Sequence, residues 1–533
     1  MLTDSRIIAG GYADAVAILL NSKEGTAMSI LGCDLQSEGK HVIYNAGNTS
    51  LNVTDTTFGW VGQGSHGAMV HSAAGEVSLV GCRLPAIASV DAPYEHLYLG
   101  KTAALARAVN CGKLTVKDDS EGHVYAEVQD AKLTIPTLPE VDANGKTAIY
   151  RPDSTALVDM GAEPYAIKNG EDITDKLQAA INSLSGTGGT IYLPAGSYRV
   201  EDAIVVKSGV ELRGAMDASI SRITNTTTLL TDFGKNNPEG KALITLQSGA
   251  GLVGIRIGYD KQDATALLPY SYAVRGEGAE VYLRNVSFDN VWNGLDLATH
   301  RCDDHMVKGL MGVAFANCVT IGGGSRGGIV RDVLTNPAYW DINNTKDDVS
   351  ENLVFIKIED CTDQLLYANF HYAGAYGLWI GDGVKNATVV THGTDYGNCV
   401  IYASEGDAEV TLINSQMAPF AGGSRFCVLT GEDFDGKLSL LGASVWTAPQ
   451  SIVKCDGGTI GIFGGNLLAW GSPTVQMNGG EVTLCGMSFT GMSGAPVLNV
   501  QDGVLTLHGN ATVTPFSVKG EGDVGGTDAY KRK

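Results

Sequence analysis

Apolar and polar positions alternate in short segments that recur at a fixed spacing in the last third of the chain. Each segment begins with glycine and places two apolar residues around a small or polar one, as at 436–440, 458–462, 480–484 and 503–507. The first apolar positions are 438, 460, 482 and 504, a step of 22 residues each time. Period-two alternation is typical of β-strands, and a fixed repeat of this length is typical of a solenoid. We therefore predict stacked coils of short strands with apolar side chains pointing inward.

The same alternation appears near the start of the chain. Segments 28–30, 51–53 and 77–79 are spaced by 23 and 26 residues. Between 133 and 165 the pattern gives way to proline and turn residues, which indicates an extended linker. We therefore divide the chain into N-terminal coils (1–132), a linker (133–165), a main set of coils (166–518) and a flexible tail (519–533).

Residues 172–214 contain the most specific pattern. Leu177, Ala180, Ile181 and Leu184 share one face of an expected helix, which is followed by the glycine-rich turn 186–189. Strand-like segments then come at 190–193, 197–200, 204–206 and 210–212, each ended by a glycine or proline break.

A helix that caps a stack of short strands resembles the N-terminal entry of pectate-lyase-like proteins. The resemblance implies an all-β chain folded as a right-handed parallel β-helix, here in two tandem parts joined by the linker. It also implies a carbohydrate-active enzyme, because this fold is used mostly on polysaccharides. Polygalacturonases of this fold carry NTD, DD, GHG and RIK motifs, of which only a DD pair is present, at 303–304. Classical pectate lyases use an arginine in an RxPR-like context, which the sequence lacks. No catalytic residue is therefore carried over.

Charge narrows the range of partners. The formal net charge is −21, which argues against nucleic acid or an anionic membrane as a partner and disfavours a polyanionic glycan. A neutral or weakly charged oligo- or polysaccharide has no such conflict. No apolar stretch is long enough for a transmembrane helix, and the N-terminus lacks the basic region of a signal peptide. We expect a cytoplasmic protein or a trimmed secreted or cell-surface protein, with self-association as a dimer or trimer left open.

The ten cysteines are scattered and form no CxxC pair. This spacing argues against zinc ribbons and dense disulfide scaffolds, and we expect the cysteines to pack as small hydrophobic residues. No metal site is predicted. No cofactor is required by the expected chemistry, although Ca²⁺ stays open.

Aligning coils predicts which side chains share a face. The segments 285–300 and 367–383 share a Gly-Leu-x-apolar phrase, which makes Leu295 and Leu378 equivalent inward residues. Asp296 and Trp379 then project outward from equivalent strands. Asp289 and His371 each follow a phenylalanine and are expected to be equivalent as well.

Acids, histidines and aromatic residues gather between 289 and 395, as a glycan site requires. A glycosidase uses two carboxylates, and aromatic faces stack on sugar rings. The adjacent pair at 303–304 can raise the pKa of one member by like-charge repulsion. The insertion at 340–352 is expected to be a loop that walls the groove. Catalytic candidates are Asp296, Asp303, Asp304, Asp382 and Asp395, and substrate-binding candidates are Asp289, Trp292, His305, His371, Trp379 and His392.

Each candidate also has a structural interpretation. Aspartates in turns commonly cap backbone N–H groups, and lone histidines are commonly hydrogen-bonded turn residues. Three functions stay open at this point. The first is a glycoside hydrolase or transglycosylase, the second is a polysaccharide lyase or epimerase acting on uronic acids, and the third is a tailspike-like or adhesin-like glycan-binding protein without catalysis.

Overall fold

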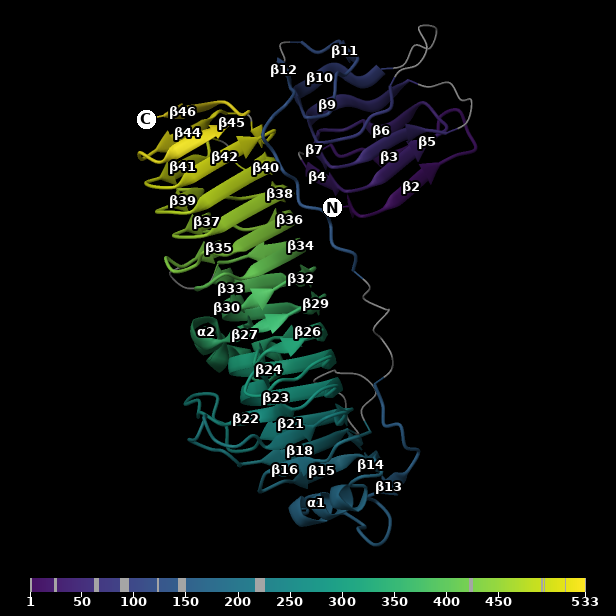
Figure 1. Ribbon diagram of the computed structural model, residues 1–533, viewed down its shortest axis with the longest axis vertical. Helices are drawn as coiled ribbons and strands as arrows, with labels where there is room; N and C mark the ends of the chain where they lie inside the picture. Colours follow the sequence, from purple (N-terminus) through teal and green to yellow (C-terminus); the bar gives the residue numbers. More distant parts are fainter. Residues whose placement is uncertain are drawn as a thin grey trace. The chain divides into compact units, whose positions relative to one another are not determined.

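The protein is described by a computed structural model. The structure describes residues 2–23, 26–61, 67–86, 95–121, 124–141, 150–215, 226–420, 425–489, 492, 494–512 and 514–532. The chain divides into two compact units. Unit 1 comprises residues 1–140, 411–417 and 437–533, and unit 2 comprises residues 141–410 and 418–436. Both units are built mainly from β-strands, and the short helices that the structure describes lie in unit 2 (Figure 1).

Unit 2 contains the short amphipathic helix that the sequence predicts. Helix α1 (Thr174–Ser183) buries Leu177, Ala180 and Ile181, and it lies at one end of the strand stack of this unit (Figure 1). The strands that follow are β14 (Gly189–Tyr192), β15 (Gly196–Arg199), β16 (Ile204–Val206) and β17 (Val210–Arg213). Their bounds agree with the predicted segments to within one residue. They form the first full coil, because β14 pairs in parallel with β17.

Later coils of unit 2 repeat this parallel pairing. One strand of each coil pairs with its equivalent in the next coil, so equivalent residues lie in rows along the stack. The strands that carry the rows discussed below are β22 (Tyr272–Glu277), β23 (Tyr282–Leu297), β24 (Met306–Ile321), β26 (Ile329–Thr335), β27 (Val354–Ile358), β30 (Phe370–Ile380) and β33 (Gly393–Ala403).

Each of these coils bends sharply at a residue with left-handed backbone. The bend lets one long strand wrap around a corner of the coil without ending its ladder. Asparagine, aspartate and glycine tolerate this conformation best, and they occupy three of the five positions. The row consists of Asn285, Gly309, Asp332, Ala368 and Thr391, with φ of 52°, 72°, 56°, 54° and 53°.

Unit 1 contains two ladders of parallel strands. The N-terminal ladder includes β4 (Thr26–Leu31), β7 (Thr49–Thr54), β9 (Ala68–Val80) and β10 (Glu95–Val109). The C-terminal ladder includes β36 (Lys437–Val445), β38 (Thr459–Leu467), β40 (Glu481–Phe489) and β42 (Val504–His508). Met28 pairs with Leu51 and Leu51 with Val77, which confirms the predicted N-terminal spacing.

The 22-residue repeat is confirmed for two steps and wrong for the third. Leu438 pairs with Ile460, and Ile460 with Val482. Val482, however, pairs with Leu505 rather than with Val504, and Val504 is exposed. The last coil therefore holds one extra residue. Because side chains alternate between faces, that residue moves Val504 from the predicted inner face to the outer one.

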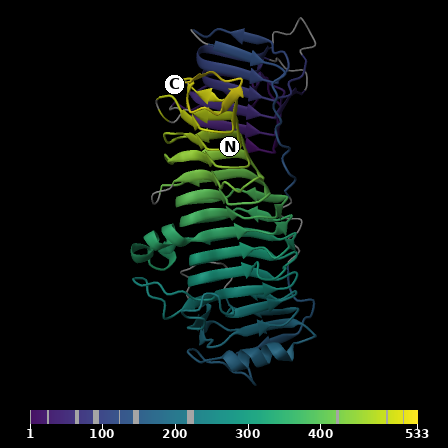
Figure 2. The same ribbon diagram turned by 60° about the vertical axis from the view of Figure 1, so that its left-hand side comes forward.

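Two further expectations are corrected by the structure. Residues 519–533, expected to be a flexible tail, include strands β45 (Asp523–Gly526) and β46 (Tyr530–Arg532), which pair with β42 and β44 (Phe516–Lys519). The expected loop at 340–352 is mostly a helix, α2 (Ile342–Asn352), after the short 3₁₀ turn η1 (Pro337–Tyr339). Asp341 caps α2 by accepting from the backbone of Asn344, and the helix stands out from the side of its stack (Figure 2).

The core is apolar in every coil, and the cysteines belong to it. All ten are buried and none forms a disulfide, as their scattered spacing predicts. Of the linker predicted at 133–165, residues 142–149 lie outside the described part of the chain. Within the part described, no helix is both long and apolar enough to cross a membrane.

Candidate functional site

One outward row of unit 2 combines charged and aromatic side chains. Successive pairing links Arg275, Asp296, Thr320, Lys357, Trp379 and Tyr402 across strands β22, β23, β24, β27, β30 and β33. The neighbouring positions Leu295 and Leu378 point inward and are fully buried. Asp296 and Trp379 therefore occupy equivalent positions, three coils apart, as the sequence alignment predicts.

Three aromatic rings cluster at the end of this row. The ring centroids of Trp379 and Tyr402 lie 5.0 Å apart, and Tyr376 lies 4.8 Å from Trp379 and 5.1 Å from Tyr402. Trp379 donates its indole N–H to Ser404 Oγ at 3.1 Å, which fixes the ring orientation. All three rings are only partly buried. A rigid, partly exposed aromatic surface of this kind suits a sugar ring.

Two carboxylates lie beside the aromatic cluster on adjacent coils. Ile358 pairs with Ile380, so Glu359 lies opposite Gly381, one residue before Asp382. A Cβ built on Gly381 would lie 3.4 Å from Glu359 Oε2, so the Glu359 side chain extends toward the next coil. Adjacent strands are about 4.8 Å apart. The two carboxylates therefore come from adjacent coils, and the backbone N–H of Asp360 donates to the carbonyl oxygen of Asp382 at 2.7 Å.

Both carboxylates keep an oxygen available. Glu359 is 37% exposed and pairs through Oε2 with Lys357 Nζ at 2.6 Å. Asp382 is exposed, and its Oδ1 accepts from the backbone of Gly383 at 2.8 Å and of Asp407 at 3.3 Å. No described residue donates to Glu359 Oε1 or to Asp382 Oδ2. These oxygens can therefore face a ligand.

Asp296 lies in the same row, but both of its carboxylate oxygens already accept hydrogen bonds within the protein. Its oxygens accept from Arg275 Nε at 2.6 Å, from the Thr299 hydroxyl at 2.6 Å, and from the backbone of Ala298 and Thr299 at 2.9 Å each. The residue is 2% exposed. Burial alone would raise the pKa of Asp296, but the hydrogen bonds from Thr299, Ala298 and Arg275 outweigh it and the pKa is lowered. This carboxylate stays ionised and holds Arg275 and the following turn in place.

Asp303 and Asp304 lie in the turn between β23 and β24. Both oxygens of Asp303 accept from Arg301 Nε at 2.9 Å, and Oδ1 also accepts from the backbone of Arg326. The hydrogen bond from Arg301 lowers the pKa of Asp303. Like-charge repulsion from Asp304 is expected to raise the pKa of one member of the pair. For Asp303 this expectation is wrong, because its hydrogen bonds from Arg301 lower the pKa. Asp304 has left-handed backbone, with φ of 51°.

Asp289, Trp292 and Asp395 are partly buried. Burial raises the pKa of Asp289 despite its ion pair with Arg256, whose Nη2 lies 2.9 Å away. Burial also raises the pKa of Asp395, which pairs in register with Tyr372. Asp289 and Asp395 belong to strand segments other than the row of Trp379, so the structure does not bring them together with Glu359 and Asp382.

The three histidine candidates lie in the core. His305, His371 and His392 are at most 1% exposed. His371 pairs in register with Thr335, and Thr335 with Gly312 and then Phe288, so its equivalent is Phe288 and not Asp289. The expected equivalence of His371 and Asp289 is therefore wrong by one residue, which moves His371 to the inner face. Burial lowers the pKa of His371 to about 4 and that of His392 to about 3.

These pKa values predict acid sensitivity of unit 2. A histidine whose pKa falls on folding binds more protons in the unfolded chain, so stability is lost as pH drops below about 6.5. Neither ring nitrogen of His392 has a hydrogen-bond partner among the described residues, which leaves nothing to stabilise its charged form. We expect His392 alone to cost about 1.4 kcal/mol of stability per pH unit between pH 6 and pH 4.

Urea unfolding across this pH range measures the effect. His392→Phe suits the neighbouring Phe355 ring, whose centroid lies 5.9 Å away, and should flatten the pH dependence. At pH 8 the histidine is neutral in both states, so any difference there reports packing alone. An unchanged slope in the variant would contradict the lowered pKa of His392.

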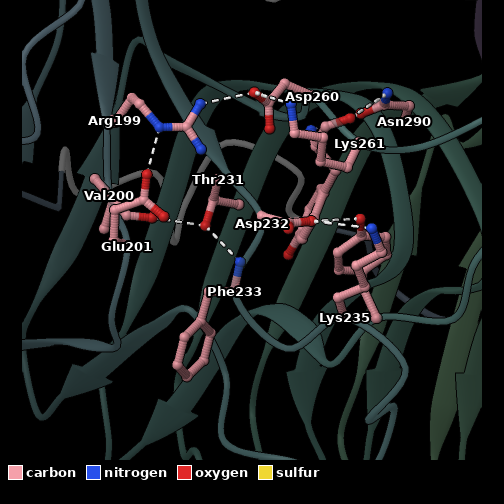
Figure 3. A network of polar contacts seen from close by, with 12 residues as sticks. Arg199, Val200, Glu201, Thr231, Asp232, Phe233, Lys235, Asp260, Lys261 and Asn290 are labelled. Carbon is pink, nitrogen blue, oxygen red and sulfur yellow. Dashed lines mark hydrogen bonds and ion pairs between the residues drawn. The ribbon is translucent and has the colours of Figure 1, made fainter.

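A network of ion pairs and hydrogen bonds holds two neighbouring loops of unit 2 against strand β15 (Figure 3). Arg199 contacts Glu201 and also donates to Asp260 Oδ2 at 2.7 Å. Asp232 accepts from the hydroxyl of Tyr270 at 2.9 Å. The network joins β15 to the loops after β18 (Thr227–Thr231) and β21 (Ile255–Tyr259). Since its acids are matched by cations or hydroxyl donors, we assign it a structural role.

The sequence missed several residues of this site, namely Lys357, Glu359, Tyr376 and Tyr402. A signal existed, because the stretch 354–359 has the same apolar alternation as 376–381. The insertion that contains α2 separates this stretch from the preceding coil and hides its register. Within the described residues, no group of three or more His, Cys, Asp or Glu side chains is arranged to hold a metal ion.

Comparison with known proteins supports the resemblance derived from the capping segment. Residues 158–249 match the family model described as rhamnogalacturonase A/epimerase, pectate lyase-like. This stretch includes α1 and the first coils of unit 2. The resemblance to pectate-lyase-like proteins is therefore confirmed for this part of the chain. No curated protein sequence matches the chain significantly.

Several solved structures resemble the chain at low sequence identity. The catalytic unit of a GH87 alpha-1,3-glucanase from Streptomyces thermodiastaticus is 15% identical, with a TM-score of 0.50, covering 72% of this chain and 69% of that one. The mannuronan C-5 epimerase A-module from Azotobacter vinelandii is 15% identical, with a TM-score of 0.39 and coverages of 67% and 96%. DFA-IIIase from Arthrobacter chlorophenolicus, as a C387A mutant, is 13% identical, with a TM-score of 0.39 and coverages of 71% and 86%. At these identities the likeness concerns the fold alone.

Proposed function

We propose that the protein is a carbohydrate-active enzyme, a glycoside hydrolase or transglycosylase acting on a neutral or weakly charged oligo- or polysaccharide. The observation that carries this proposal is the placement of Glu359 and Asp382 on adjacent coils beside the Tyr376–Trp379–Tyr402 cluster. We also infer that the strands form a right-handed parallel β-helix in two tandem parts. The parallel registers and the GH87 likeness support that architecture.

The two carboxylates would divide the chemistry between them. Lys357 Nζ lies 2.6 Å from Glu359 Oε2 and holds that carboxylate in place, so we assign Glu359 the role of nucleophile. Asp382 would then protonate the leaving oxygen as Glu359 bonds to the anomeric carbon. In the second step Asp382 would take a proton from water or from a sugar hydroxyl, which displaces Glu359. Retaining enzymes hold their two carboxyl groups about 5–5.5 Å apart, and the proposed mechanism needs the same separation here.

The sugar would be held by the aromatic cluster. We expect Trp379→Ala to raise KM about five- to tenfold while kcat changes less, because the lost stacking acts on bound substrate and transition state alike. Trp446→Ala is the matched control, since Trp446 is also partly exposed and also donates to a serine, Ser444, at 3.2 Å. Initial rates over a range of glycan concentrations give both constants. Equal KM values for Trp379→Ala and the parent would contradict the platform role.

The reaction class is tested by product analysis on a panel of neutral and uronic-acid glycans. We expect new reducing ends and, by NMR, retention of the anomeric configuration. An unsaturated uronic-acid product would instead favour a lyase, and glycan binding without any product would favour a tailspike-like or adhesin-like binding protein. Activity after chelation with EDTA tests whether Ca²⁺ is needed. The expectation from paired-carboxylate chemistry is that activity is retained.

A further inference from the structure

A second face of the same coils contains a pocket that the proposed reaction does not use. Its volume is about 750 Å³, and it lies along the left-handed corners of unit 2. The side chains that matter for its chemistry are Lys308, Met311, Asp332, Leu334, Tyr339 and Phe370. A pocket of this size accommodates a small ring-shaped ligand or one end of a larger one.

The floor of the pocket is lined by apolar side chains. Met311 pairs with Leu334, and Leu334 with Phe370, so the three side chains form one row. The Phe370 ring lies over Gly393 in the next coil, where any Cβ would come within 2.5 Å of the ring. Glycine at this position therefore leaves space for the ring. Such a floor matches the apolar face of a pyranose.

Lys308 lines the pocket, and its register partners in the coils on either side are also cations. Arg284 pairs in register with Lys308, and Lys308 with Arg331. Arg331 is satisfied by Asp332 at 2.9 Å and by the Tyr367 ring, whose centroid lies 5.2 Å away. Arg284 and Lys308, by contrast, form no ion pair with any residue in the described ranges. With 58 acids and 37 bases in the chain, unpaired neighbouring bases beside a pocket favour an anionic ligand.

We propose that this pocket binds a sugar acid without cleaving it. The hexuronate ring would lie on Phe370 and its carboxylate would be bound by Lys308. Hydrolysis needs two carboxylates, whereas the only one among the described lining residues is Asp332, which is paired with Arg331. The pocket therefore suits one uronic-acid unit and would anchor the glycan that carries it away from the reaction centre.

Binding of trigalacturonate to the full chain, followed by calorimetry at low salt, tests the proposal. The fully methyl-esterified trisaccharide is the matched neutral probe. We expect Lys308→Met to weaken trigalacturonate binding about tenfold, because a charge-assisted hydrogen bond is lost. Binding of the ester should not change. Lys241→Met, which removes an exposed lysine elsewhere in unit 2, should leave both affinities unchanged. Raising the salt concentration should weaken binding of the acid only.

Other outcomes would overturn the proposal. Equal affinity of the parent and Lys308→Met for trigalacturonate would contradict the proposed role of Lys308. Equal affinity of the parent for trigalacturonate and its methyl ester would contradict recognition of the carboxylate. If the parent protein converts trigalacturonate to an unsaturated product and Lys308→Met does not, the pocket is a lyase centre and not an anchor. Failure of the hydrolase proposal can be distinguished from failure of this one, because binding at this pocket can be measured without any hydrolysis. Trp379→Ala should leave trigalacturonate binding at this pocket intact.

Discussion

Glu359→Gln and Asp382→Asn should each lower kcat by about 10²–10⁴-fold, the usual contribution of a positioned acid, base or nucleophile. Both replacements keep the shape of the side chain and remove only its charge and proton exchange. KM should change little, since the aromatic cluster around Trp379 is untouched. Initial rates with whichever glycan the product analysis identifies, followed by thermal denaturation of each variant, separate a chemical loss from a folding loss.

A control for these variants is available close by. Asp363→Asn changes an exposed aspartate that accepts from Asn386 at 2.6 Å and has left-handed backbone, which asparagine also tolerates. Its activity should equal that of the parent. Unchanged kcat in both Glu359→Gln and Asp382→Asn would contradict the catalytic roles proposed for these residues. The remaining acids of the 289–395 region would then be tested in their place.

Asp528→Ala should destabilise unit 1 by about 3–5 kcal/mol, the cost of leaving one member of a buried ion pair alone. The Asp528 side chain is 1% exposed and lies 2.9 Å from Arg107 Nη1. It also accepts from the side chain of Asn510 at 2.7 Å and from its backbone at 3.0 Å. Arg107 is in β10 and Asp528 follows β45, so the pair joins the two ladders of unit 1. Hydrogen exchange of unit 1 amides measures the loss.

Asp55→Ala provides the comparison for this variant. Asp55 pairs with Arg83 at 2.7 Å, but that pair is 33% and 63% exposed, so loss of the ion pair should cost less than about 1 kcal/mol. Alanine at this left-handed position, with φ of 47°, adds about 1–2 kcal/mol of backbone strain. The double variant Arg107→Met/Asp528→Leu should recover most of the stability, since no buried charge is left unpaired. Similar losses of stability for Asp55→Ala and Asp528→Ala would show that burial does not make the Arg107–Asp528 pair more costly to break than an exposed pair.

Local patterns predicted the repeating part of the fold well. The period-two alternation around 460 and 482 reflects inward packing in each coil, and the face of Leu177 and Ile181 identifies the capping helix. Helix α2 escaped prediction because only Thr345, Val349 and Ser350 are buried in it, too few to produce an amphipathic pattern. Its stability depends on the coils that it packs against, and a single segment does not reveal such contacts.

The candidate site was predicted in part. The alignment of Leu295 with Leu378 placed Asp296 and Trp379 in one row, because inward residues must stack coil over coil. It could not show that Asp296 is fully engaged by Arg275 and Thr299, since those contacts come from different segments. The histidine at 371 was misplaced by an offset of one residue, which in a strand exchanges the inner and outer faces.

Helix α2 enters its stack without disturbing the ladder. Val354, just after the helix, pairs in register with Asn317 before it and with Tyr376 beyond it. The segment between β26 and β27 can therefore vary in length and composition at little cost to the strands. The carboxylates of the proposed site belong to the ladder and its turns, whereas α2 belongs to an insertion that packs against β30. Selection could remodel this insertion while the ladder stays fixed, so the two can evolve independently in this architecture.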